Sequence, residues 1–136
     1  MDYSKLLVKE YAHWLVQVFE HQNYLGRCVV WCKREDAIDL AEATKEEQEE
    51  LMLILKDLKD ATARAFNADW FNYAFLGNET PHLHGHFVPR YSSDREFNGL
   101  TFTDELWGHK YQTDKSFNTT QELLEAVRIK LKEELG

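Results

Sequence analysis

Half of the histidines in this chain lie at alternate positions within one short segment, as His82, His84 and His86. Side chains two residues apart share one face of an extended strand. The spacing therefore predicts a β-strand that carries three imidazoles on one face, with Arg90 further along that face. The apolar residues between the histidines would point the other way, into a core. A row of imidazoles that ends near an arginine suggests a binding site for an anion or a metal ion.

The length and composition predict one globular domain, residues 1–136. Hydrophobic residues make up 43 % of the chain and aromatic residues 13 %, which argues against disorder. The net charge of −8 argues against broad contact with nucleic-acid backbones, because such contact requires a basic surface. No apolar run approaches the roughly 18 residues of a membrane span, and the N-terminal stretch is mixed and charged, unlike a signal peptide. We therefore expect a cytoplasmic protein with no nucleic-acid or membrane partner.

The sequence pattern predicts two hairpins, each followed by a helix. Apolar, alternating stretches at residues 11–20 and 27–33 indicate the first pair of strands, and residues 69–76 with the histidine segment indicate the second. Thr44 and Glu47 have capping-box spacing and predict the start of a long helix after the first hairpin.

The C-terminal part of the chain predicts one more helix. Thr119 and Glu122 again have capping-box spacing, and leucines recur at helical intervals through residues 120–135. Residues 92–116 show no clear periodicity, and their aromatic side chains predict a segment that packs on the body. Because regular βαβ alternation is missing, we expect an α+β fold with a mostly antiparallel sheet.

Metal binding is one interpretation of the histidine row. Three alternate positions span four strand rises, or roughly 13 Å, whereas a Zn–N bond is only about 2.1 Å. One ion can hardly contact all three imidazoles unless the strand bends, so we expect no metal. A site made of two histidines and a third ligand from elsewhere remains open, and so does a purely structural role.

Nucleophilic catalysis on phosphorus is the interpretation that explains most of the pattern. A neutral imidazole is a good nucleophile near pH 7, because its pKa of about 6.5 leaves much of it unprotonated. Attack on a phosphoryl group forms a phosphoramidate, which water then hydrolyses. Such a nucleophile needs an acceptor for its second ring nitrogen and cationic or N–H donors around the phosphate oxygens. Flanking histidines could supply those contacts or pass a proton to the leaving group.

The histidine segment, residues 81–90, resembles the signature of the histidine triad (HIT) family, in which three alternate histidines are each followed by non-polar residues. Residues 72–78 resemble the approach to the triad in microbial HIT hydrolases, and residues 22–27 resemble the loop before the second strand. The resemblance covers about residues 10–112. It implies a HIT-like fold, with one long helix after the first hairpin and a C-terminal helix beyond.

The resemblance implies a role for each histidine and for two amides. His84 corresponds to the nucleophile that attacks the α-phosphate of a nucleotide. His86 would contact the phosphate or the scissile bridging atom, and His82 would order the site, its backbone carbonyl fixing the tautomer of the nucleophile. Asn72 matches an amide that holds the phosphate from the neighbouring strand, and Asn78 falls in the loop that wraps the α-phosphate.

Three further residues are candidates for ligand contacts. The resemblance implies that the nucleoside lies against the first hairpin, near Gln22. Arg90 is a candidate phosphate ligand, although it could equally pair with an acid. His109 could close over the leaving group or simply belong to a packed C-terminal segment.

The resemblance implies a nucleotide hydrolase or nucleotidyl transferase. Such an enzyme acts at the α-phosphate of a dinucleoside polyphosphate or a nucleoside phosphoramidate, through a nucleotidyl-histidine intermediate. It implies no cofactor and a homodimer. Two alternatives remain: a nucleotide-binding regulatory protein with little activity, and a metal-binding protein.

Two residues depart from the family pattern. Gly85 stands where a hydrophobic residue is usual, and glycine leaves a gap in a strand. We expect a tryptophan, Trp31 or Trp70, to fill that gap. Glu79 lies in the phosphate loop, where an inward carboxylate would repel substrate, so it either turns outward or alters specificity.

Overall fold

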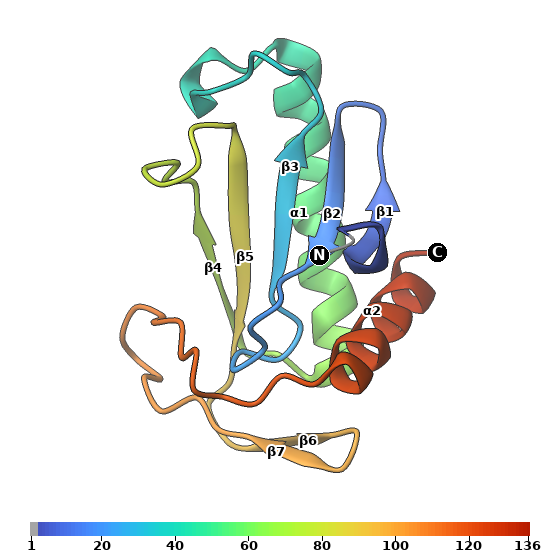
Figure 1. Cartoon of the computed structure of the whole chain (residues 1–136), viewed down its shortest axis with the longest axis vertical. Helices are drawn as coiled ribbons and strands as arrows, with labels where there is room; N and C mark the ends of the chain where they lie inside the picture. Colours follow the sequence, from blue (N-terminus) through green and yellow to red (C-terminus); the bar gives the residue numbers. More distant parts are fainter. Residues whose placement is uncertain (1–2) are drawn as a thin grey trace.

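The structure, a computed structural model, describes residues 3–136, so Met1 and Asp2 of the stretch compared with a signal peptide lie outside the described residues. Its centre is a five-stranded sheet of order β1-β2-β3-β5-β4, with every neighbouring pair antiparallel (Figure 1). This confirms the expected α+β fold with an antiparallel sheet. The strands are β1 (Leu7–Glu10), β2 (Trp14–Val18), β3 (Cys28–Cys32), β4 (Trp70–Ala74) and β5 (His84–Arg90).

Two helices complete the main body. The long helix α1 (Lys45–Phe66) runs behind the sheet in Figure 1, and α2 (Gln121–Leu135) packs against α1 and β1. Within residues 3–136, neither helix is both long enough and apolar enough to cross a bilayer. The smaller elements are the 3₁₀ segments η1 (Tyr3–Leu6) and η2 (Leu40–Glu42) and a separate hairpin of β6 (Arg95–Phe97) and β7 (Leu100–Phe102).

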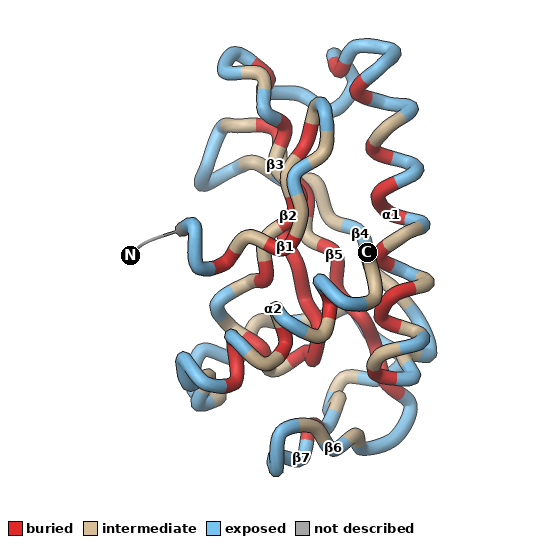
Figure 2. Tube along the Cα trace, turned by 90° about the vertical axis from the view of Figure 1, so that its right-hand side faces the viewer, coloured by how far each residue is buried: buried red, intermediate tan, exposed pale blue. Residues whose placement is uncertain are grey.

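The core lies between the sheet and the helices. Strand β2 buries every second side chain, as expected for a sheet with one covered face. Trp14 and Val30 from the sheet and Leu58 from α1 are among its fully buried members. Figure 2 shows the buried residues concentrated in the strands, while burial along α1 alternates with exposure. No helix of residues 3–136 covers the opposite face of the sheet, which leaves that face available for a site (Figure 1).

The start of α1 is set by the predicted capping box. The Thr44 hydroxyl accepts a hydrogen bond from the Glu47 backbone N–H, and the Glu47 carboxylate accepts one from the Thr44 N–H. A cap of this kind stabilises a helix by about 1 kcal/mol. Asn67 ends the helix in the left-handed conformation, with φ of 56°.

Both predicted hairpin pairings are present. Strand β2 pairs with β3, and β4 pairs with β5. The β5 strand begins at His84, however, so His82 precedes it rather than lying within the predicted strand.

Other elements depend on contacts between distant segments, which a local sequence pattern does not encode. Strand β1 was not predicted, and its short apolar run is held by pairing with β2. The hairpin of β6 and β7 lies inside the segment that lacks periodicity. The capping residue of α2 is Thr120, whose hydroxyl accepts from Leu123 N–H, so the predicted box on Thr119 was wrong by one position. The Thr119 hydroxyl instead accepts the Gln22 backbone N–H.

A phenylalanine, not a tryptophan, occupies the space beside Gly85. A Cβ placed on Gly85 would lie 2.3 Å from two ring atoms of Phe75. Trp70 is 64 % exposed, and Trp31 stacks on His84 instead. The expectation of a tryptophan was wrong because Trp31 points to the other face of the sheet.

We predict that Gly85→Ala lowers the free energy of unfolding by about 1–3 kcal/mol, because the new methyl group overlaps the Phe75 ring. Urea denaturation measures the change. The control is the same substitution in a Phe75→Leu background, where the smaller side chain should relieve much of the added cost. Equal costs in both backgrounds would contradict this explanation.

Candidate functional site

The histidine face of the sheet forms one wall of an open cleft. His84 and His86 project from β5 into a cleft of about 630 Å³. Trp31 lies directly opposite His84 on β3, and their rings stack with centroids 4.4 Å apart. The loop of residues 77–80 and the segment around Tyr111 line other parts of the cleft. The cleft thus joins elements far apart in the sequence.

His84 is held by a backbone carbonyl. Its Nδ1 lies 2.6 Å from the carbonyl oxygen of His82. A carbonyl only accepts, so Nδ1 carries the proton and a neutral His84 keeps its lone pair on Nε2. That is the nitrogen a nucleophile would use.

His82 lies just outside the cleft and helps to fix the backbone. Its Nε2 donates to the carbonyl of Cys32 at 2.6 Å, and its N–H donates to Thr80 O at 2.8 Å. The Cys32 N–H in turn donates to Leu83 O. These bonds tie the approach to β5 against the end of β3, which positions the carbonyl that His84 uses.

His86 has a cationic neighbour. Its Nδ1 lies 3.1 Å from a terminal nitrogen of Arg27, and its ring meets the Phe19 ring edge-on. Burial lowers the pKa of His86 to about 4, with further contributions from the charges of Arg27 and His84. His86 is therefore neutral at pH 7.

The turn before the triad supplies one wall of the cleft. Asn78 and Glu79 both line the cleft, and both are exposed. Asn78 thus shares the cleft with His84 and His86, and its contact with a phosphate stays a prediction. Glu79 lines the same cleft with its side chain exposed to solvent, so the structure does not turn it away from the site.

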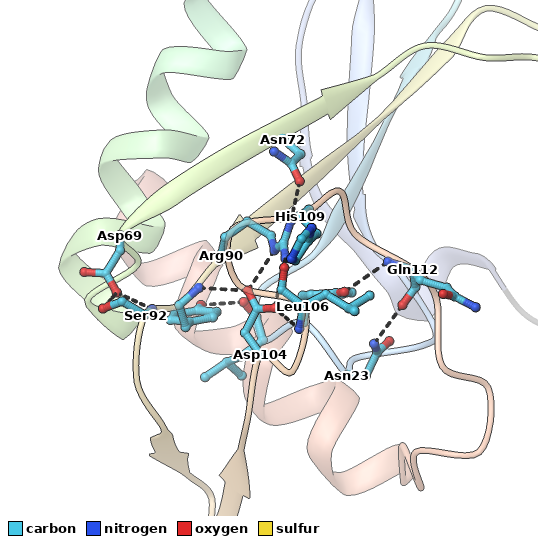
Figure 3. A network of polar contacts seen from close by, with 12 residues as sticks. Asn23, Asp69, Asn72, Arg90, Ser92, Asp104, Leu106, His109 and Gln112 are labelled. Atoms are coloured by element: carbon cyan, nitrogen blue, oxygen red, sulfur yellow. Dashed lines mark hydrogen bonds and ion pairs between the residues drawn. The ribbon is translucent and has the colours of Figure 1, made fainter.

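The structure places Arg90 and Asn72 in a different network (Figure 3). Arg90 is 2 % exposed, and one edge of its guanidinium, Nε with a terminal nitrogen, donates to both carboxylate oxygens of Asp104, at 2.7 and 2.9 Å. Its other donors reach Asn72 Oδ1, His109 O and Leu106 O. All five N–H groups are thus used within the protein.

This network bears on the predicted roles of Arg90, Asn72 and His109. With no donor left, Arg90 pairs with an acid and is not a phosphate ligand, so its predicted ligand role was wrong. Neither Arg90 nor Asn72 lines the cleft, and the Asn72 carbonyl oxygen is committed to Arg90. His109 is exposed, and its backbone carbonyl accepts a hydrogen bond from Arg90. Its side chain does not line the cleft.

Gln22 is likewise a structural residue. It is fully buried, and its amide nitrogen donates to the carbonyls of Phe19 and Arg27. Its amide oxygen accepts the Gly26 N–H. Gln22 closes the loop before β3 from within, so it offers no group to a nucleoside, and the prediction that it contacts the ligand was wrong.

Sequence reasoning did not single out the residues that surround His86. Arg27, Tyr111 and Thr113 line the cleft beside it. The only sequence sign for Arg27 was its position between a glycine and an apolar strand. Tyr111 and Thr113 lie in the segment without periodicity, where no local pattern indicated a contact with the cleft.

No arrangement of three or more His, Cys, Asp or Glu side chains that could hold a metal ion occurs among residues 3–136. His82 and His84 each direct one ring nitrogen to a backbone carbonyl.

Comparison with sequence families gives one match. A profile described as the HIT domain matches residues 23–93, more than half of the chain. No curated protein matches the chain at a significant level.

Comparison with solved structures shows the same fold in several proteins. A hypothetical histidine triad nucleotide-binding protein of Sulfolobus tokodaii has 19 % identity and a TM-score of 0.71, over 96 % of this chain and 83 % of that one. A histidine triad protein of Marinobacter aquaeolei has 22 % identity and a TM-score of 0.70, over 98 % and 91 %. The NitFhit protein of C. elegans has 18 % identity and a TM-score of 0.63, over 93 % of this chain but 27 % of that one. At these identities the likeness concerns the fold.

We predict that His86 makes the protein less stable in mild acid. The pKa of His86 is about 4 in the folded chain against about 6.5 when unfolded. The unfolded state therefore binds more protons between these values, so stability is complete above about pH 6.5 and falls towards pH 4. One such group contributes at most about 1.4 kcal/mol per pH unit.

Urea denaturation at intervals from pH 7 to pH 4 measures this effect. His86→Gln should lose stability less steeply than the wild-type chain over this interval. Equal slopes for the two proteins would contradict a depressed pKa.

Proposed function

Because this chain belongs to the histidine triad family, we propose that it is a nucleotide hydrolase or nucleotidyl transferase that acts at an α-phosphate through a nucleotidyl-His84 intermediate. The substrate classes are dinucleoside polyphosphates and nucleoside phosphoramidates. The observation that carries the proposal is the 2.6 Å hydrogen bond between His84 Nδ1 and the His82 carbonyl. This bond leaves a lone pair on His84 Nε2, beside an open cleft.

The reaction proceeds in two steps. His84 Nε2 attacks the α-phosphorus, and the bond from phosphorus to the leaving group breaks with its electron pair on the leaving atom. Water then attacks the phosphorus, the phosphorus–nitrogen bond breaks, and His84 regains its lone pair. The water gives up a proton to solvent, and a nucleoside monophosphate is released. An acceptor other than water makes the same site a transferase.

Neighbouring groups assist both steps. His86 offers a ring N–H to the scissile bridging atom, and the exposed Asn78 in the turn before the triad offers an amide to the phosphate. Hydrogen-bond donors fixed around a reacting phosphate stabilise the charge that is redistributed in the transition state. Trp31, stacked at 4.4 Å, limits the orientations open to the His84 ring. No cofactor enters this scheme, and we propose that it operates in the cytoplasm.

We predict that His84→Ala abolishes turnover of diadenosine tetraphosphate and adenosine 5′-phosphoramidate, with a loss of at least about 10⁴-fold, because it removes the Nε2 lone pair that attacks phosphorus. Release of adenosine monophosphate measures the rate. His13→Ala, which removes a histidine outside the cleft, is the matched control and should retain activity. Native rates in His84→Ala would disprove the mechanism. Tight binding of the monophosphate by the wild-type chain without turnover would favour the regulatory alternative.

We further propose that the chain forms a homodimer through the outer edge of β4. This strand ends the sheet, and Trp70, Tyr73 and Leu76 on or beside it are 64 %, 45 % and 74 % exposed. An exposed apolar edge strand invites pairing with another strand. A second copy fits because antiparallel pairing about a two-fold axis is self-complementary.

Sedimentation equilibrium tests the dimer. The wild-type chain should sediment at twice the monomer mass, and Tyr73→Pro should shift the equilibrium towards the monomer, because proline cannot donate to a ladder and is disfavoured inside a paired strand. A monomeric wild-type chain at micromolar concentration would contradict the proposal.

A further inference from the structure

Arg27 is a buried arginine at the edge of the catalytic cleft. It is 3 % exposed, and its guanidinium lies against two aromatic rings, 4.2 Å from the Phe19 centroid and 4.8 Å from the Tyr111 centroid. One terminal nitrogen donates to the Thr113 hydroxyl at 2.7 Å. The other lies 3.1 Å from His86 Nδ1. Stacking between two rings fixes the plane of the guanidinium, so the contact with His86 is held from both sides.

The surroundings of Arg27 contrast with those of Arg90. Arg90 has the Asp104 carboxylate as a bidentate partner. Arg27 instead contacts a hydroxyl, an imidazole and two aromatic rings. Its Nε is buried with no hydrogen-bond partner in the described part of the chain. Burial accordingly lowers the pKa of Arg27 to about 10, which still leaves it charged at pH 7.

A guanidinium decides which tautomer His86 adopts. Arginine has only donors, so His86 Nδ1 must accept with its lone pair. The ring proton of neutral His86 is then on Nε2, and this N–H is the donor left for a ligand in the cleft. Protonation of Nδ1 would place an N–H against an N–H and would break the contact.

This fixed state limits what His86 can do chemically. A neutral imidazole with its proton on Nε2 can donate a hydrogen bond to the leaving atom. It cannot act as an efficient proton donor, because loss of that proton would leave an imidazolate anion. A general acid would need the protonated ring, which Arg27 opposes.

Leaving groups differ in their need for a proton. When a phosphoanhydride is cleaved, the departing phosphate leaves as a stable anion with the electron pair on oxygen. When a phosphoramidate is cleaved, the departing amine must receive a proton on nitrogen as the phosphorus–nitrogen bond breaks. A site that donates a hydrogen bond without a proton serves the first reaction better than the second.

We propose that Arg27 is a positioning residue that sets leaving-group specificity: by holding His86 as the Nε2–H tautomer, it directs the site to phosphoanhydrides with anionic leaving groups and away from phosphoramidates with amine leaving groups. This rests on the proposed function and narrows its substrate class. An anionic leaving group in the cleft would also lie near the Arg27 guanidinium, whose contacts described here include no carboxylate. This attraction likewise favours phosphoanhydrides over phosphoramidates.

The kinetic test compares two substrates in the full-length protein at pH 7. The value of kcat/KM is measured for diadenosine tetraphosphate and for adenosine 5′-phosphoramidate. Wild-type protein should prefer the phosphoanhydride by about 100-fold or more. In Arg27→Met the preference should fall by at least about tenfold, because loss of the Arg27 charge raises the pKa of His86 and so increases the fraction of protonated rings that can serve as an acid. Arg27→Lys, which keeps the charge, should restore part of the preference.

A second measurement reads the tautomer without relying on activity. Nitrogen-15 NMR of the imidazole rings should show His86 of the wild-type chain unprotonated on Nδ1 and protonated on Nε2 at pH 7. In Arg27→Met, the two nitrogens should both become partly protonated. Lys115→Met is the matched control, since it removes an exposed cation from the same cleft and should leave the His86 tautomer unchanged. Thermal unfolding confirms that each variant is folded.

The outcomes separate this proposal from the function on which it rests. If wild-type protein cleaves neither substrate, the proposed function and the specificity both fall. If it cleaves both and Arg27→Met shows the same preference and the same His86 tautomer as wild type, only the role of Arg27 is overturned. A wild-type His86 protonated on Nδ1 would also overturn it.

Discussion

The antiparallel register between β3 and β5 is the constraint on which the site depends. It sets Trp31 opposite His84, Val29 opposite His86 and Val30 opposite Gly85. A shift by one residue would turn every side chain of β5 to the other face. In the observed register, the imidazoles of His84 and His86 lie on the open face, and Gly85 lies on the buried face, where the Phe75 ring fills the space beside it. The same pairing brings the end of β3 to His82, whose carbonyl orients His84.

Local sequence pattern predicted the parts of the molecule that local physics determines. The alternation of the histidines predicted the open face of β5, and the Thr44 and Glu47 spacing predicted the start of α1. The parts that were missed depend on contacts between distant segments. Arg27 meets His86 across 59 positions of sequence, and Gln22 is held by its own loop. Neither arrangement produces a periodicity or a residue spacing from which a single sequence would predict it.

The two buried arginines show why residue type alone misassigned Arg90. An arginine near a phosphate site is a natural ligand candidate, but a carboxylate within reach removes that possibility. Asp104 lies 14 positions beyond Arg90 in a segment without periodicity, so its approach was not foreseeable. Together they anchor the segment that carries Tyr111 back to the cleft, where that ring packs on Arg27. Arg90 thus acts on the site through the chain it holds, while Arg27 acts on His86 directly.

In the proposed reaction, His84 carries the nucleotide during turnover. The most direct measurement is quenching of the wild-type chain in alkaline denaturant during reaction with a dinucleoside polyphosphate labelled at the α-phosphate, followed by peptide mapping at alkaline pH. The label is expected on the peptide that contains His84 and should be stable in alkali and labile in acid, as a phosphorus–nitrogen bond is. Turnover with label on another residue, or with no trapped label under conditions that preserve phosphoramidates, would contradict it.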